Sequence, residues 1–212
     1  MNSPRIVYRM FPSEAHADAL ASGKVWITTL AVCRASESSG RGDPDEAHHI
    51  HLVTEAKGNM DDPQVRAVAE RTRLFAPGVT GRNVSLSNIM LFGNLPDAYV
   101  LCMTAHPPQA RLLDEFGKYV VAIRRPATFV RRVTRALEAK IELNIGAFGP
   151  VTYAPSISFE AEQARAPLGF VKDPSFAYQH EFRGLWQVEG LSPIAPFEID
   201  VIDIEHLCQR IA

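Results

Sequence analysis

The chain of 212 residues has no excess of charge of either sign, because 22 Lys and Arg residues are balanced by 24 Asp and Glu residues. Proteins that wrap duplex nucleic acid neutralise many phosphates through a basic face. No block of basic residues of that kind is present. The composition therefore argues against a duplex-binding protein and leaves a local acidic ligand open.

Cysteine and long apolar runs are also scarce. The three cysteines (Cys33, Cys102 and Cys208) are odd in number, widely spaced and without a CxxC pair, so we expect reduced thiols and no disulfide framework. No apolar run approaches the ~20 residues that a membrane helix needs, and residues 1–10 contain no apolar signal segment. We expect a cytoplasmic protein with no membrane partner.

Several common catalytic motifs are missing. The sequence has no GxxxxGK[ST] loop, no GxGxxG turn after a strand, no GxSxG elbow and no HExxH helix. His48, His49 and His51 follow an acidic stretch that contains Asp43 and Glu46. Neighbouring residues on a loop rarely converge, so we predict a solvated loop there and no metal site.

The elements that are present predict an α+β fold in a single domain over residues 1–212. Short apolar and β-branched runs predict strands at residues 6–11, 25–30, 90–92, 98–103, 120–123, 151–153, 178–186 and 197–202. Capping residues and helical spacing predict helices at residues 14–22, 62–75, 112–116 and 129–137, and a terminal helix from Asp203 to Ile211. Residues 36–51 are predicted to form a surface loop, and residues 155–167 a loop or a mobile lid.

The most informative stretch runs from Phe176 to Trp186. On a strand, Gln179, Glu181 and Arg183 would share one face, because side chains alternate. An edge strand with an Arg183–Glu181 ion pair explains this pattern without any activity. Alternatively, the carboxylate could hydrogen-bond a ribose hydroxyl and stabilise the positive charge that develops when an N-glycosidic bond breaks. The guanidinium of Arg9, on an early strand, could then hold a pyrophosphate. Together, the carboxylate and the guanidinium fit NAD as a substrate.

These residues resemble the ADP-ribosyltransferase superfamily of the Arg/Ser-Thr-Ser/Glu type, through Tyr8-Arg9, Cys102-Met103-Thr104, and Gln179 with Glu181. The resemblance implies two small sheets with flanking helices around an NAD cleft. It also implies that Arg9 anchors NAD, Thr104 supports the nicotinamide-side ribose, Gln179 positions the acceptor and Glu181 is the catalytic glutamate. The sequence departs from the family in having no Ser-Thr-Ser triplet. Tyr8 is either a packed aromatic or a stacking partner for nicotinamide or adenine.

The chain also resembles a bacterial family of uncharacterised domains over most of its length, from Val7 to about Trp186. That family begins with a Tyr-Arg strand and continues with an Asp-Pro loop, which here would be Gly42-Asp43-Pro44-Asp45-Glu46. It ends with a Lys followed by Glu-aromatic-Arg, here Lys172 and Glu181-Phe182-Arg183. This resemblance implies a fold without an established activity.

The sequence thus predicts an enzyme that binds NAD and transfers ADP-ribose to a macromolecule, protein or nucleic acid, or to water. The resemblance adds the context of a toxin or phage-defence effector, with a neutralising partner protein. Two other functions stay open. One is a non-catalytic binding or interaction module with a shallow or filled cleft, in which Glu181 and Arg183 pair with each other or with Arg9. The other is a metal-independent nuclease using His180, Glu181 and Arg183, which requires side chains on opposite strand faces to converge.

Overall fold

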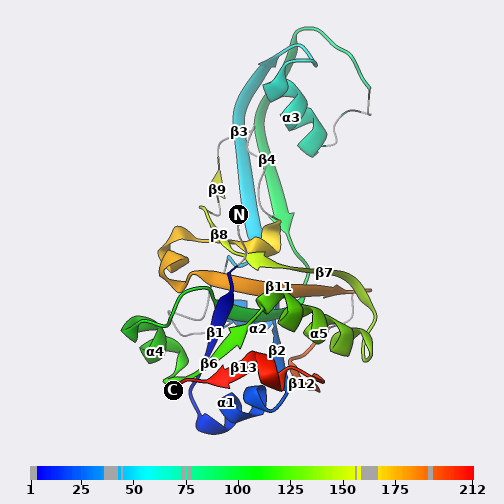
Figure 1. The fold of residues 1–212 in the computed structure, drawn as a ribbon. Coiled ribbons are helices and arrows are strands. Elements are labelled where there is room, and N and C mark those ends of the chain that lie inside the picture. Colours follow the sequence, from blue (N-terminus) through cyan, green and yellow to red (C-terminus); the bar gives the residue numbers. More distant parts are fainter. Residues whose placement is uncertain are drawn as a thin grey trace.

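A β-hairpin arm projects from a body that is built on one large antiparallel sheet (Figure 1). This computed structural model describes residues 4–35, 43, 45–72, 75, 78–155, 157–158, 167–190 and 193–212. The α+β class predicted from the sequence is confirmed. No helix among the described residues is both long and apolar enough to cross a membrane.

The large sheet contains eight strands, and all of its neighbouring strands are antiparallel. Its main order is β12-β2-β5-β1-β6-β13, and β11 joins β5 to β7. The strands are β1 (Ile6–Phe11), β2 (Lys24–Thr29), β5 (Tyr99–Thr104), β6 (Tyr119–Arg124), β7 (Leu143–Pro150), β11 (Glu181–Val188), β12 (Phe197–Asp200) and β13 (Cys208–Arg210).

Strand β5 is the branch point of this sheet. One of its edges pairs with β11 over its whole length, from Tyr99 to Thr104. Its other edge is shared, since Tyr99 and Val100 pair with β2 while Thr104 pairs with Tyr8 of β1. Strands β1 and β2 therefore part from each other along the middle of β5.

Helices α1 (Glu14–Ala21) and α5 (Pro126–Glu138) pack on the sheet through the largest hydrophobic core. In α5 the buried residues are Pro126, Phe129, Val130, Val133 and Leu137, which form one face of the helix, as their spacing predicts. Ser13 caps α1 by accepting a hydrogen bond from the His16 amide. Two shorter helices, α2 (Leu30–Ala35) and α4 (Ala110–Phe116), complete this part of the body.

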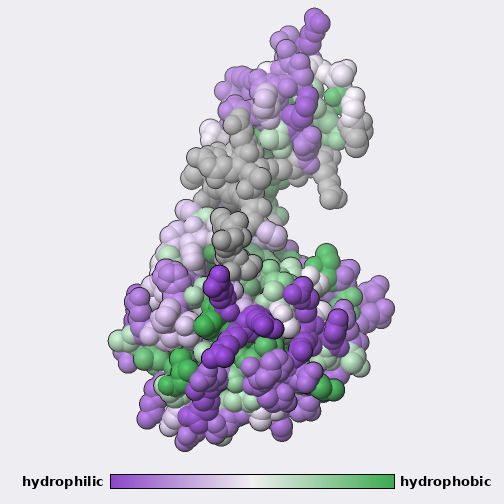
Figure 2. Space-filling view, in the orientation of Figure 1, coloured by the Kyte–Doolittle hydropathy of each residue, from purple (hydrophilic) through white to green (hydrophobic). Residues whose placement is uncertain are grey.

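The arm consists of β3 (His48–Gly58), β4 (Val84–Asn94) and α3 (Pro63–Thr72), and it has a small core of its own. Val65 and Val68 of α3 pack against Val53 and Leu86 of the hairpin. The end of the arm around α3 is largely hydrophilic on the face shown in Figure 2. The short elements at the base of the arm are β8 (Thr152–Tyr153), β9 (Ile157–Ser158), β10 (Val171–Lys172), and the 3-10 helices η1 (Leu168–Phe170) and η2 (Pro174–Gln179).

The predicted terminal helix is wrong. A 3-10 turn, η3 (Glu205–Leu207), is followed by strand β13, which pairs with β6. The expectation of two small sheets is likewise replaced by one eight-stranded sheet with a two-stranded and a three-stranded sheet beside it. Strand β7 was missed, because residues 143–150 contain two glycines and lack the β-branched run that marks the other strands.

The predicted surface loop at residues 36–51 is also wrong where the structure describes it. Asp43 and Glu46 are buried, and β3 begins at His48. The reason is electrostatic, since Glu46 pairs with the buried guanidinium of Arg183. Residues 36–42 and 44 lie outside the described residues, as do 156 and 159–166 of the predicted lid.

Gly117 ends α4 at a position where only glycine fits. Its φ is +116°, and an added Cβ would lie 2.1 Å from the carbonyl oxygen of Phe11. We expect Gly117→Ala to lower the free energy of unfolding by about 2–4 kcal/mol, because backbone strain and overlap add.

Gly190→Ala is the matched control for this substitution. Gly190 also has a positive φ, +87°, but no described atom lies within 4 Å of its added Cβ. Its cost should be about 1 kcal/mol, from backbone strain alone. Urea denaturation of both variants measures the difference, and equal losses would contradict the close contact.

Candidate functional site

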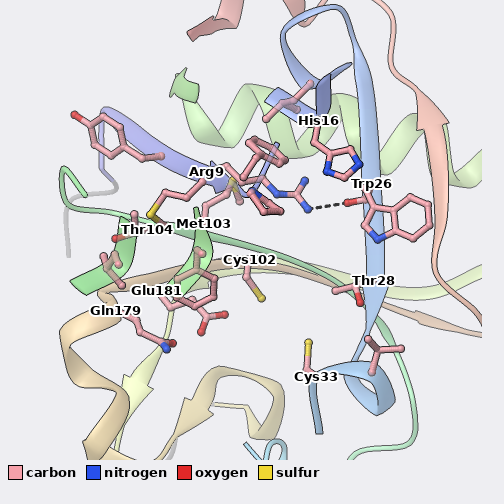
Figure 3. Close-up of a pocket in the computed structure, with 18 of the residues that line it drawn as sticks. Arg9, His16, Trp26, Thr28, Cys33, Cys102, Met103, Thr104, Gln179 and Glu181 are labelled. Atoms are coloured by element: carbon pink, nitrogen blue, oxygen red, sulfur yellow. Dashed lines mark hydrogen bonds between the residues drawn. The ribbon is translucent and has the colours of Figure 1, made fainter. Parts of the chain in front are cut away.

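A cavity of about 630 Å3 lies where β1 and β2 part along β5 (Figure 3). Strand β2, helix α1 and the start of β11 contribute further walls. The residues that the sequence singled out for binding or catalysis all line it: Tyr8, Arg9, Thr104, Gln179 and Glu181. The structure therefore brings the five together from three separate parts of the chain.

Strand register places three of these residues in one row. Tyr8 of β1 lies opposite Thr104 of β5, and Thr104 lies opposite Glu181 of β11. Backbone hydrogen bonds of the sheet thus set the spacing of this row. Glu181 is held at the first residue of its strand, where its amide also donates to the hydroxyl of Tyr153 at 2.7 Å.

Arg9 reaches into the cavity with an incompletely bonded guanidinium. Its Nη2 donates to the carbonyl of Trp26 at 3.0 Å, whereas Nη1 is buried and has no partner among the described residues. Burial lowers the pKa of Arg9 to about 10, so the group is still charged at neutral pH. A buried, charged donor without a partner costs free energy until an acceptor binds it.

Glu181 lies in a buried ionic cluster. Arg183 donates from Nε to Glu181 Oε1 at 2.7 Å, and Lys172 Nζ lies 3.3 Å from Oε2. Glu46 completes the cluster by pairing with Arg183 Nη2, and it lies 3.9 Å from Lys172. We call these four residues the charge cluster: Glu46, Lys172, Glu181 and Arg183.

The two positive and two negative members of the charge cluster balance each other. Burial alone would raise the pKa of Glu181, but the charges of Arg183 and Lys172 outweigh it and lower that pKa to about 2. Burial alone would lower the pKa of Lys172, but the carboxylates of Glu181 and Glu46 raise it above its usual value. Glu181 is therefore ionised at neutral pH beside the cavity.

Gln179 lies outside the strand on which the sequence placed it. It ends the 3-10 helix η2, and β11 begins only at Glu181. Strand alternation does hold for Glu181 and Arg183, which lie on one face and bond each other. Gln179 still reaches the same place, since its Oε1 accepts a hydrogen bond from Lys172 at 3.1 Å.

His180 connects η2 to β11 in a left-handed conformation, with φ 43°. Its exposed ring stacks on His106 with centroids 3.9 Å apart, while Glu181 and Arg183 are buried. The nuclease hypothesis needs these three side chains to converge, and this geometry does not support that.

The hydroxyl of Thr104 is engaged in a local turn. It accepts a hydrogen bond from the His106 amide at 3.3 Å and lies 3.4 Å from the His106 carbonyl. Thr104 lines the cavity next to Glu181 in register, so its support of a ribose stays a prediction.

Sequence reasoning missed several residues of the cavity and its walls. Glu46 and Lys172 line the cavity with Glu181. Lys172 was noted only as part of a family resemblance, and Glu46 was predicted to lie in a solvated loop. The cavity also includes Trp26 and His16, which had been given no role in binding. The outward alternation of residues 24, 26 and 28 on β2 is the signal that could have identified Trp26.

Among the described residues, no group of three or more His, Cys, Asp or Glu side chains is arranged to hold a metal ion. Comparisons with models of protein families, with curated proteins and with solved structures found no match. The function must therefore be argued from the site itself.

The ionic bonds of Glu181 predict a specific dependence of stability on pH. Its pKa is near 2 in the folded chain and ~4.3 in an unfolded one, so its stabilising contribution is complete above pH 4.3 and is lost as the pH falls toward 2. We expect the stability difference between wild type and Glu181→Gln to narrow by on the order of 3 kcal/mol across this range. Urea denaturation from pH 2 to 7 measures it.

Glu138→Gln, at an exposed position on α5, is the control. Its difference from wild type should be small at every pH. A Glu181→Gln difference that stayed constant with pH would contradict the assigned ion pairs.

Cys102 hydrogen-bonds two neighbours in the cavity wall, Cys33 and Glu181. The pKa of its thiol is raised well above the usual value, mainly by the hydrogen bond with Cys33 and secondly by burial. Because the thiolate is the nucleophile, we expect Cys102 to resist iodoacetamide at pH 7.5. Cys33→Ala should accelerate its alkylation, as mapped by peptide mass spectrometry. Fast labelling of Cys102 in the native wild type, at the rate seen in urea, would contradict this assignment.

Proposed function

We propose that this chain binds NAD in the cavity between β1 and β2 and transfers its ADP-ribose to a macromolecule or to water. One observation carries the proposal: Arg9, with an unpartnered guanidinium nitrogen, and ionised Glu181 line one cavity although they lie at opposite ends of the sequence. A guanidinium suits a pyrophosphate, and a carboxylate suits the ribose of a departing nicotinamide.

The cavity has the dimensions of a small-molecule site. Its volume of about 630 Å3 falls within the ~300–1,000 Å3 that ligand pockets span. Arg9 Nη1 offers a hydrogen bond that no described residue accepts, so a phosphate oxygen would satisfy it. Binding of an anion is thus favoured by the desolvation cost that Arg9 already carries.

The proposed reaction breaks the bond between C1′ of the ribose and the nicotinamide nitrogen. The bonding electron pair leaves with nicotinamide, which becomes neutral, and C1′ becomes oxocarbenium-like. The Glu181 carboxylate accepts a hydrogen bond from the ribose 2′-hydroxyl and stabilises this charge. The acceptor then forms a bond to C1′ and releases its proton to solvent.

Lys172 and Arg183 support this role of Glu181 by keeping it ionised. Oε1 receives Arg183, whereas Oε2 receives Lys172 only at 3.3 Å. The Cys102 thiol also hydrogen-bonds this carboxylate. A thiol is a weak donor, so a ribose hydroxyl would replace it. In this proposal Gln179 orients the acceptor and Thr104 supports the nicotinamide-side ribose, in line with the resemblance to ADP-ribosyltransferases, while Tyr8 stacks on the nicotinamide.

The same resemblance is the basis for proposing a toxin or phage-defence effector that a partner protein neutralises. The segments of the bacterial family resemblance meet in space, since Glu46 of the Asp-Pro stretch contacts Arg183 and Lys172.

The second candidate function is a non-catalytic binding module, and a specific contact favours it. That hypothesis expects Glu181 to pair with Arg183, and the two are joined at 2.7 Å. An open cavity is not what it expects, because it requires a filled or shallow cleft. It further requires that NAD produce no thermal shift.

Labelled NAD distinguishes the two functions. Wild-type protein is incubated with NAD in buffer and with cell lysate, RNA or DNA, and nicotinamide release and labelled products are measured. We expect release by the wild type, a loss of roughly 100-fold or more in Glu181→Gln, and NAD affinity weakened about ten-fold or more in Arg9→Gln.

Glu138→Gln is the matched control for the carboxyl change, since its side chain is exposed on α5. Because breaking a buried ion pair can cost ~3–5 kcal/mol, melting curves first establish the temperature at which Glu181→Gln is folded. No release by the wild type under any condition, or equal release by wild type and folded Glu181→Gln, would refute the transferase.

A further inference from the structure

Trp26 is an exposed aromatic side chain at the cavity. It is 51% exposed, whereas Trp186, the other tryptophan, is fully buried in the core. Along β2, Val25 and Ile27 point into the core, so alternation turns Trp26 to the other side, where it lines the cavity. An indole left half in water beside a cavity offers a flat apolar face that a ligand can cover.

Trp26 is directly connected to the charged group of the cavity. Its own carbonyl accepts the hydrogen bond from Arg9 Nη2 at 3.0 Å, and Figure 3 shows the indole beside the guanidinium, with His16 near both. Arg9 Nη1 remains without a partner among the described residues. An aromatic face and an unsatisfied cation therefore lie next to each other in the same cavity.

The opposite end of the cavity is formed by Gln179 and Glu181. Contacts define the order from one end to the other. Trp26 bonds Arg9, Figure 3 shows Cys102 between Arg9 and Glu181, and Cys102 hydrogen-bonds Glu181. The cavity thus runs from an aromatic face, past a guanidinium, to a carboxylate.

We propose that Trp26 is the stacking platform for the purine base of a nucleoside diphosphate whose phosphates bind Arg9. Base–aromatic stacking needs only a free π face, and a phosphate is the natural partner for the unfilled Arg9 donor. The extension of this site to NAD rests on the proposed function. In that case adenine binds at Trp26, the pyrophosphate at Arg9 and the nicotinamide ribose at Glu181. A purine nucleotide site at Trp26 and Arg9 also stands without that chemistry.

Lys24 and Glu198 flank this platform. They form an ion pair at 3.7 Å, both are about half exposed, and both line the cavity. Glu198 of β12 lies directly opposite Trp26 in register. The pair places one positive and one negative charge beside Trp26, whose side chain stays half exposed.

Tryptophan fluorescence tests the proposal, since Trp26 is the exposed one of the two tryptophans. We expect ADP and AMP to quench the wild-type emission, and Trp26→Phe to remove this change while keeping the affinity for ADP within about two-fold. Trp26→Ala should weaken ADP binding roughly ten-fold or more, measured by calorimetry, because the stacking is lost. Its affinity for inorganic pyrophosphate should stay unchanged, since Arg9 is intact.

Phe92→Ala is the matched control, because Phe92 is 72% exposed on β4 and does not line the cavity. It should bind ADP like the wild type. Absence of ADP binding, equal ADP affinity in wild type and Trp26→Ala, or quenching that persists in Trp26→Phe would each overturn the proposal.

The two proposals fail separately. ADP binding that depends on Trp26, without nicotinamide release from NAD, supports the purine site and refutes the transferase. Nicotinamide release together with an ADP affinity that is the same in wild type and Trp26→Ala supports the transferase and refutes the purine site.

Discussion

The charge cluster of Glu46, Lys172, Glu181 and Arg183 is the constraint on which the cavity wall depends. Arg183 is fully buried, and such a charge is tolerated only with matched partners and complete hydrogen bonding. Its three donor contacts reach Glu181, Glu46 and the carbonyl of Gly169, which come from three segments of the chain. These bonds fix the segment before the arm, η1 and β11 in one arrangement.

Arg9 and Glu181, two of the charged groups that line the cavity, differ in how many of their hydrogen-bonding atoms have partners among the described residues. Glu181 is saturated on one oxygen by Arg183, and Lys172 approaches the other. Arg9 has one bond to a carbonyl and an unpartnered nitrogen, with no described carboxylate bound to it. Arg9 Nη1 thus keeps a donor for which the described residues supply no acceptor, while Glu181 is held in place and kept ionised. This asymmetry is what a ligand with a phosphate at one end and a sugar at the other requires.

Local features of this fold could be predicted from the sequence, and features that depend on distant partners could not. Strand β1 and the buried face of α5 follow from β-branched content and helical spacing. Strand β13 forms only because β6, some 85 positions earlier, offers an edge, as the bond from Arg124 to Gln209 illustrates. Glu46 was predicted to be solvated because its partner Arg183 lies 137 positions later in the sequence, and no residue near Glu46 indicates that the two pair. In the same way, the order of Arg9 and Glu181 predicted a shared cavity, but the ion pairs that hold Glu181 were beyond sequence reasoning.

The fork in β5 has a consequence for the size of ligand that this scaffold can accept. Strand β2 leaves β5 after Val100 and β1 joins it at Thr104, so the width between those two strands equals the stretch of β5 that neither of them covers. Side chains alternate with a period of two. Adding or removing two residues in that stretch would change the separation of β1 and β2 along β5 and keep every remaining side chain on its present face. Variants of this chain with a longer or shorter β5 would then accommodate larger or smaller molecules while the rest of the sheet kept its pairing.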